Sequence, residues 1–371
     1  MPRILVSCGE ASGDLYAGAL ARELRALNPS LEIAGIGGDH LRSTGASLLA
    51  DYRGIAVTGL VEALRVLPRA RAMYRRIVDD AAALRPDVFV AVDFPDFNFR
   101  VAEAMRRLGV PVVYYISPQL WAWRPGRMKA MRRFARLVLV IFPFEERIYR
   151  EAGVPVEFVG HPLVELARAS GPRVEVRRSL GLDADKPVVA LLPGSRPNEL
   201  RTILPDLVAA SRLIAARVPS AQFVVARAPG LADELFAQLG GPTIIERRAD
   251  DVLAAADVAL TASGTATVQA AIHGTPMVIV YRVSPLTYAI GKPFVKVDTY
   301  GMVNLVAGRR IVPELVQQAF TPEAVASEAV SLLTDRARAS DMGAALADVR
   351  AKLGGPGASR RAAEAILRVV N

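Results

Sequence analysis

One stretch of the chain, residues 262–269, indicates most clearly what the sequence can fold into. The apolar run before it, 257–260, has the character of a buried strand, and a helical pattern follows it. Ser263, Gly264 and Thr265 join the two elements: a hydroxyl can cap the helix, and glycine lets a ligand approach the backbone. The N–H groups at a helix start suit a phosphate. Such turns also occur in α/β proteins without a ligand, so the turn alone favours neither explanation.

The same order of strand, turn and helix recurs along the chain and predicts an α/β fold. The expected strands are the apolar runs at 4–7, 33–38, 87–92, 111–116, 137–142, 156–159, 188–192, 223–226, 243–245, 258–260 and 278–281. A polar stretch near 169–186 interrupts the alternation in this chain of 371 residues, so we expect two doubly wound domains. They span 1–168 and 169–345, and a helical segment, 346–371, follows and returns to the first domain.

The composition excludes several classes of protein. No apolar run reaches the roughly 18 residues that a membrane-spanning helix needs. The single cysteine, Cys8, can form no internal disulfide, which fits a reducing cytoplasm. The three histidines, His40, His161 and His273, have no ligand-like spacing, so we expect no metal site. The net charge of +9 favours anionic partners, but scattered basic residues and only 6% aromatic residues argue against a nucleic-acid-binding surface.

Polar residues follow the first expected strand. Glu10, Ser12 and Asp14 lie at its carboxyl end, where open α/β sheets place their ligands. They can contact a polar substrate, or they can simply cap and solvate the turn. Both explanations are open at this point.

Two aspartates three residues apart follow the strong strand at 87–92. Asp93 and Asp96 are well placed there for acid–base work. The simpler explanation is that Asp96 caps a helix expected over 99–108, but one carboxylate suffices as a cap. The second is therefore a mild excess.

In the second half, Gly194, Ser195 and Arg196 follow the buried strand at 188–192. Glycine, a hydroxyl and arginine at a strand-to-helix turn can hold a diphosphate. The turn lacks the lysine and following hydroxyl of a P-loop. Near the second strand, His40 stands where a dinucleotide fingerprint needs its third glycine, which disfavours hydride transfer.

The stretch from 57 to 76 is basic and amphipathic, with Pro68 interrupting it. A stretch of this kind can lie on a membrane surface. The alternative is an ordinary helix packed on the sheet, and without further context that is the simpler explanation.

Six motifs together closely resemble the lipid-A-disaccharide synthase family. They occur in that family's order over nearly the whole chain: GEASGD at 9–14, DFPDFN at 93–98, SPQLWAW at 117–123, LPGSR at 192–196, ASGTA at 262–266 and NLVAGR at 304–309. The resemblance implies a GT-B glycosyltransferase, in which two Rossmann-like domains face each other across a cleft. The N-terminal domain would bind the acceptor and the C-terminal domain the UDP-sugar.

The resemblance also implies a reaction. UDP-2,3-diacylglucosamine would donate its sugar to 2,3-diacylglucosamine 1-phosphate (lipid X), giving a β-1,6-linked disaccharide 1-phosphate and UDP. The anomeric centre inverts, and the family needs no metal or other cofactor. Family members are peripheral to the cytoplasmic face of the inner membrane, so anionic lipids are expected partners. Some form homodimers by exchanging C-terminal segments.

Residue roles follow from the same resemblance. Asp96 would be the general base, with Asp93 as the alternative, and Arg196 would neutralise the leaving diphosphate. The nucleotide would also contact Gly194, Ser195, Ser263, Gly264 and Thr265. The sugar or acceptor would contact Glu10, Ser12, Asp14, Asp93, Asn98 and Asn304. Membrane contact would come from Leu64, Val66, Leu67, Arg65, Arg69 and Arg71.

Gln269 departs from the family pattern. Many relatives carry a glutamate there that accepts both ribose hydroxyls, and glutamine offers one acceptor oxygen in its place. Gln269 is still expected among the nucleotide-binding residues, with a weaker bond to the ribose diol than a glutamate would make.

Other functions remain open from sequence alone. One is a GT-B enzyme with another acceptor, and another is a UDP-GlcNAc 2-epimerase, which would turn over UDP-GlcNAc without a lipid acceptor. A non-enzymatic nucleotide-sugar sensor is the third, although the presence of both Asp96 and Arg196 argues against it.

Overall fold

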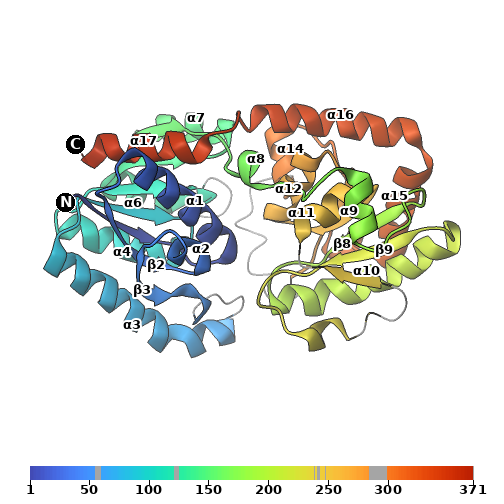
Figure 1. Cartoon of the computed structure of the whole chain (residues 1–371), viewed down its shortest axis with the longest axis horizontal. Helices are drawn as coiled ribbons and strands as arrows, with labels where there is room; N and C mark the ends of the chain where they lie inside the picture. The colour runs from blue at the N-terminus through green and yellow to red at the C-terminus, as the bar shows by residue number, and fades with distance from the viewer. Residues whose placement is uncertain are drawn as a thin grey trace. The chain divides into compact units, whose positions relative to one another are not determined.

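The computed structural model describes residues 1–54, 60–120, 125–237, 239, 243–246, 248–283 and 299–370. Of 54, 60–65, 125 and 243–246 it describes the backbone. The chain divides into two compact units (Figure 1). The first contains Met1–Pro162 and Leu353–Asn371, and the second contains Leu163–Lys352.

The first unit is built on a parallel sheet of seven strands in the order β3-β2-β1-β4-β5-β6-β7. The strands are β1 (Arg3–Ser7), β2 (Glu32–Gly37), β3 (Ser47–Asp51), β4 (Val88–Val92), β5 (Val112–Tyr115), β6 (Ala135–Val140) and β7 (Val156–Phe158). The strand order reverses between β1 and β4, where Ser7 pairs with Ala91. A reversal of this kind is where open α/β sheets bind ligands, beyond the carboxyl ends of the strands.

Helices cover both faces of this sheet. They are α1 (Ala11–Leu27), α2 (Asp39–Arg42), α3 (Leu60–Leu84), α4 (Pro95–Arg107), α6 (Met128–Phe134), α7 (Pro143–Glu151) and α17 (Ala358–Val370), with 3-10 turns η1 (Tyr52–Gly54) and η2 (Pro125–Arg127). On one face, Ile77 of α3, Val101 of α4 and Met131 of α6 share a core with Phe89 and Tyr114. On the other, α17 lies along α1 (Figure 1).

The second unit repeats this plan with six parallel strands in the order β10-β9-β8-β11-β12-β13. The strands are β8 (Val188–Leu192), β9 (Gln222–Ala226), β10 (Thr243–Glu246), β11 (Val258–Ala262), β12 (Met277–Tyr281) and β13 (Glu314–Val316). The helices are α8 (Leu163–Leu166), α9 (Arg173–Ser179), α10 (Pro197–Arg217), α11 (Ala249–Ala255), α12 (Thr265–His273), α14 (Met302–Ala307), α15 (Pro322–Thr334) and α16 (Arg336–Lys352), with η3 (Asp233–Phe236) and η5 (Gln317–Ala319). Here the order reverses between β8 and β11, where Leu192 pairs with Thr261.

The prediction of two doubly wound α/β domains is confirmed, and three local details differ. The edge strands β3 and β13 were not expected, because their half-buried residues give no continuous apolar run. Pro68 lies inside α3 and does not interrupt it. Helix α4 begins at Pro95, so Asp96 lies in its first turn and is not its cap. Within the described ranges, no helix is long and apolar enough to cross a membrane.

Candidate active site

In the first unit, the turns that follow β1 and β4 are pressed against each other. The two strands pair directly, so the turns leave the same edge of the sheet. A Cβ atom at Gly9 would lie 2.1 Å from Cγ of Phe94, which only glycine avoids. The motifs at 9–14 and 93–98 therefore form one continuous structure.

Asn98 ties these two turns together and is fully buried. Its Nδ2 donates to the carbonyl oxygens of Asp93 at 2.8 Å and of Ser7 at 3.1 Å. The hydroxyl of Ser7 donates to Asn98 Oδ1 at 2.7 Å. Asn98 was predicted to bind substrate. In the structure its side-chain amide joins the ends of β1 and β4.

The backbone between β4 and α4 is strained. Asp93 and Phe94 have φ angles of 46° and 50°, a left-handed conformation that costs a non-glycine residue about 1–3 kcal/mol. The hydroxyl of Tyr114 donates to the Asp93 carbonyl oxygen at 2.7 Å. Burial raises the pKa of Tyr114 well above its ordinary value, so this donor stays protonated. Strain held in place by buried partners is frequent at functional sites.

The strained turn presents Asp96 at the start of α4. Its side chain is 75% exposed, and Nη2 of Arg127 lies 2.5 Å from its Oδ1. The guanidinium favours the ionised carboxylate, which is the form that a general base needs. Asp96 is therefore an accessible, charged carboxylate on a rigid support.

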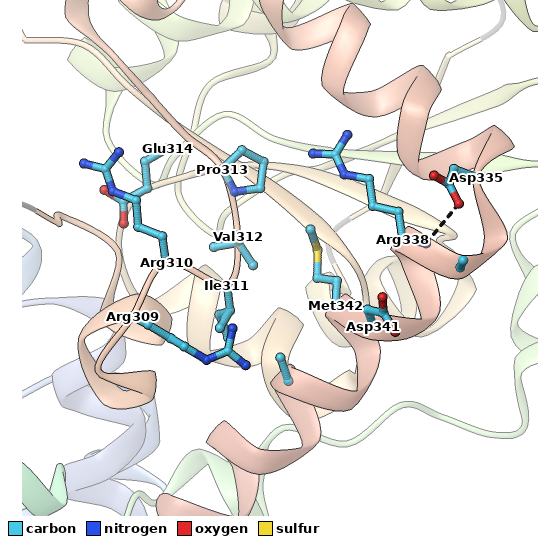
Figure 2. Close-up of a pocket in the computed structure, with 12 residues that line it drawn as sticks. Arg309, Arg310, Ile311, Val312, Pro313, Glu314, Asp335, Arg338, Asp341 and Met342 are labelled. Carbon is cyan, nitrogen blue, oxygen red and sulfur yellow. Dashed lines mark hydrogen bonds between the residues drawn. The ribbon is translucent and has the colours of Figure 1, made fainter.

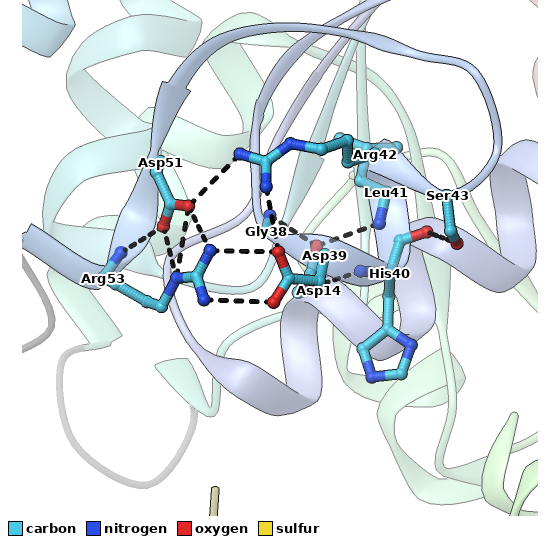
Figure 3. Close-up of polar contacts among 9 residues, drawn as sticks. All are labelled: Asp14, Gly38, Asp39, His40, Leu41, Arg42, Ser43, Asp51 and Arg53. Atoms are coloured by element: carbon cyan, nitrogen blue, oxygen red, sulfur yellow. Dashed lines mark hydrogen bonds and ion pairs between the residues drawn. The ribbon is translucent and has the colours of Figure 1, made fainter. Parts of the chain in front are cut away.

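Asp14 has a different environment from Asp96. Its side chain is buried, and it accepts hydrogen bonds from the backbone N–H groups of Gly38, His40 and Leu41 at 2.6, 2.9 and 3.2 Å (Figure 3). These contacts hold the start of α2 against α1. Glu10 and Ser12, from the same motif, are half-buried.

Helix α2 is also fixed from its outer side. The guanidinium of Arg53 bonds both carboxylate oxygens of Asp39 at 3.0 Å and reaches Asp51 at 2.6 Å (Figure 3). Hydrogen bonding from Arg53 lowers the pKa of Asp51. Helix α2, which lies beside the 9–14 motif, is therefore held by polar contacts on two sides.

In the second unit, we call the turn at 193–196 the arginine turn. Its backbone N–H groups are bonded to the carboxylate of Glu199, which lies three residues after the turn. Oε2 of Glu199 accepts from the N–H groups of Ser195 at 2.9 Å and Arg196 at 3.3 Å. Oε1 lies 3.3 Å from Nη1 of Arg196. A Cβ atom at Gly194, whose φ is 119°, would lie 2.5 Å from the same carboxylate. The N–H groups expected to meet a phosphate thus already have an anionic partner.

The turn at 262–265, which we call the glycine turn, is arranged differently. Gly264, with φ 149°, is the N-cap of α12, and no described side chain caps this helix. The expected caps are therefore wrong: Ser263 donates to the Tyr300 carbonyl oxygen at 3.3 Å, and Thr265 is exposed in the first turn. Among the described residues, no side chain therefore accepts from the N–H groups at the start of α12.

Two amide side chains of this unit have polar partners. Asn304 is buried, donates to Glu314 at 2.6 Å and accepts from the N–H of Ile311 at 2.8 Å. Nε2 of Gln269 donates to Oδ1 of Asp250 at 3.1 Å, and Nε2 of His273 lies 3.0 Å from the same oxygen. Asn304 thus holds the loop before β13, as Asn98 holds its turn in the first unit.

Comparison with known proteins identifies the family. A family model described as lipid-A-disaccharide synthetase matches residues 4–369. The lipid-A-disaccharide synthase of Myxococcus xanthus is 44% identical over 374 residues, covering 100% of this chain and 98% of that relative. The chain belongs to the lipid-A-disaccharide synthase family. It is a glycosyltransferase of lipid A biosynthesis.

Solved structures agree on the fold of this chain. UDP-GlcNAc 2-epimerase from Neisseria meningitidis, bound to UDP-GlcNAc, has a TM-score of 0.71 and 12% identity, covering 99% of this chain and all of that one. The glycotransferase of kitacinnamycin has a TM-score of 0.67 and 19% identity, with full coverage of both chains. At such identities the likeness shows the GT-B fold alone.

The remaining residues predicted for the site and the membrane contact are only partly described. In α3, Val66 and Leu67 are half-buried, whereas Arg69 and Arg71 are exposed. The side chains of Leu64 and Arg65 lie outside the described residues, as do Trp121 and Trp123 of the 117–123 motif. Within the described part of the chain, no cluster of three or more His, Cys, Asp or Glu side chains could hold a metal ion.

Sequence reasoning missed Arg127 and Glu199, both in contact with predicted site residues. Glu199 carried a signal: glutamate three residues after an N-cap is the spacing of a capping box. Arg127 carried none, because 31 positions separate it from Asp96 in the sequence.

The protein also has an open cavity of about 750 Å³ in its second unit (Figure 2). Arg309, Arg310, Arg338 and Asp341 line it together with Met342. The sulfur of Met342 accepts from the N–H of Met277, the first residue of β12. The cavity therefore lies toward the amino-terminal edge of the sheet, whereas both phosphate-binding candidates lie at the carboxyl edge.

Proposed function

We propose that the protein transfers 2,3-diacylglucosamine from UDP-2,3-diacylglucosamine to the 6-hydroxyl of lipid X, with inversion and without a metal. The exposed and ion-paired carboxylate of Asp96 carries this proposal. Asp14 is buried against backbone N–H groups, and Asp93 belongs to the strained turn. Asp96 is thus the carboxylate of these motifs best placed to accept a proton from a substrate hydroxyl.

In this reaction the acceptor oxygen bonds to the anomeric carbon as its proton passes to Asp96. The bond from that carbon to the diphosphate breaks, and its electron pair leaves with UDP. Arg196 supplies positive charge to the leaving group, and the open start of α12 supplies N–H donors. Ser195 and Gly194 shape the arginine turn, and Ser263, Gly264 and Thr265 form the phosphate-binding surface.

The test is UDP release from UDP-2,3-diacylglucosamine, with and without lipid X, in the presence of EDTA. We expect release that requires lipid X, persists in EDTA and falls about 10²- to 10⁴-fold in Asp96→Asn. Release without lipid X would indicate an epimerase or hydrolase. Full activity of Asp96→Asn would move the base to Asp93 or elsewhere.

We further propose that α3 meets the cytoplasmic face of the inner membrane. Exposed Arg69 and Arg71 fit anionic headgroups, and the half-buried Val66 and Leu67 lie one turn away on the same helix. Combined Val66→Ser, Leu67→Ser, Arg69→Glu and Arg71→Glu changes should reduce sedimentation with anionic vesicles. Arg212→Glu with Arg336→Glu, both exposed in the second unit, is the matched control. Unchanged sedimentation of the α3 variant would contradict the proposal.

A further inference from the structure

Arg127 makes two contacts with one face of α4. Its Nη2 lies 2.5 Å from Oδ1 of Asp96, and its guanidinium carbon lies 5.3 Å from the centroid of the Phe99 ring. Asp96 and Phe99 are three residues apart, so they lie on the same side of the helix. One planar cation thus bonds the carboxylate and covers the aromatic ring at once.

The two partners of this ion pair differ in freedom. The side chain of Asp96 is 75% exposed, whereas that of Arg127 is 27% exposed. Phe99 in turn packs edge-on against Phe134 and Tyr114, with ring centroids 5.1 and 5.8 Å away. The arginine is therefore held by the core of the first unit, and the aspartate is the partner that it restrains.

We infer that Arg127 is a positioning residue that fixes the rotamer and the ionised state of Asp96 for proton abstraction. This inference rests on the proposed function, in which Asp96 is the base. Without the contact to Arg127 the rotamer of Asp96 would be less tightly fixed, and a misplaced catalytic group can cost about 10²-fold in rate. Arg127 itself need not touch either substrate.

The chain offers a matched control for this pair. Arg133, on α6, also reaches across to α4, where its Nη2 lies 3.1 Å from Oε2 of Glu103. Both pairs join the same two regions of the first unit, but only the Arg127 pair includes a predicted catalytic residue. A general loss of packing between these elements should therefore appear in both variants.

The experiment measures kcat, KM for lipid X and the pH profile of Arg127→Ala, Arg127→Lys and Arg133→Ala, with thermal unfolding of each. We expect kcat of Arg127→Ala to fall about 10- to 100-fold, with KM for lipid X within about 3-fold of the wild type. The acidic limb of its pH profile should move to higher pH, because the carboxylate loses its cation. Arg127→Lys should recover part of the rate, and Arg133→Ala should retain wild-type kcat.

Adding Arg127→Ala to Asp96→Asn tests whether the two residues act together. No further loss of kcat is expected, because the carboxylate to be positioned is already gone. If Asp96→Asn is inactive and Arg127→Ala behaves like Arg133→Ala, the inference is wrong and the proposed function stands. A raised KM for lipid X at unchanged kcat would also overturn it, by making Arg127 a ligand of the acceptor phosphate. A fully active Asp96→Asn would instead refute the proposed base.

Discussion

The arginine turn and the glycine turn follow neighbouring strands of one sheet, yet they differ in what occupies them. In the arginine turn, the N–H groups of Ser195 and Arg196 are bonded to the carboxylate of Glu199. In the glycine turn, Gly264 begins α12 with no described side chain as a cap. Two turns that look alike in sequence therefore differ: Glu199 occupies the backbone N–H groups of the first, and no described side chain caps the helix start at the second.

This difference assigns separate tasks to the two turns. A donor diphosphate would meet the side chain of Arg196 at the first turn, because the backbone there is already satisfied. At the second it would meet the backbone itself, with the helix dipole behind it. Each assignment can be tested by a substitution that affects one turn only.

Among changes to these two turns, the largest effect is expected from Arg196→Ala. If the arginine turn acts through its side chain, kcat/KM for the UDP-sugar should fall about 10²- to 10³-fold, as when one donor to a developing charge is removed. The control is Arg217→Ala, because Arg217 is exposed in the last turn of α10, the helix whose N-cap is Arg196. A loss of less than about 3-fold, on the scale of an exposed surface charge, would refute the assignment.

The glycine turn is tested by Gly264→Ala. A Cβ atom there meets no described atom within 4 Å, so it would project into the space assigned to the phosphate. We expect UDP to bind about 10-fold more weakly, since the positive φ also strains the start of α12 by about 1–3 kcal/mol. Binding can be measured by calorimetry.

Gly274→Ala is the matched control, because Gly274 ends the same helix with φ 69° and its Cβ also meets nothing within 4 Å. Both variants should lose stability, but only Gly264→Ala should lose affinity for UDP. Equal affinities in the two would mean that the open turn takes no part in binding.

Much of this fold could be predicted because its central strands are buried on both faces. Strands such as β4 and β8 appear in the sequence as unbroken apolar runs, and the polar turns after them mark the carboxyl edge of each sheet. The edge strands β3 and β13 were missed because none of their residues is fully buried, so neither appears as an unbroken apolar run.

The contacts that the side chains of these turns make could not be predicted equally well. The sequence around Asn98 and around Asn304 suggests ligand contact. Both side chains are buried, however, and they bond to backbone groups of the protein. The pairs of Asp96 with Arg127 and of Gln269 with Asp250 join separate elements, so no local pattern specifies them. The assignment of residues to substrates remains a prediction.

A smaller effect is expected from Glu199→Gln. Glutamine keeps an acceptor oxygen for the N–H of Ser195 but removes a negative charge from beside the proposed diphosphate site. UDP should therefore bind about 2- to 5-fold more tightly, as expected for one charge acting at a partly exposed site. Glu323→Gln, in the first turn of α15, changes a helix start outside the site and should have no effect. Weaker binding would show that Glu199 orients Arg196 for the donor.

The smallest effect concerns Gln269, one turn into α12. Gln269 donates to Asp250, which also bonds His273, so a glutamate at this position would face an existing carboxylate. Gln269→Glu should therefore destabilise the protein by about 0.5 kcal/mol at neutral pH, and Asp250→Asn in the same chain should remove that penalty. Urea unfolding of the two single variants and the double variant measures the coupling. An additive result would show that Asp250 does not explain the glutamine.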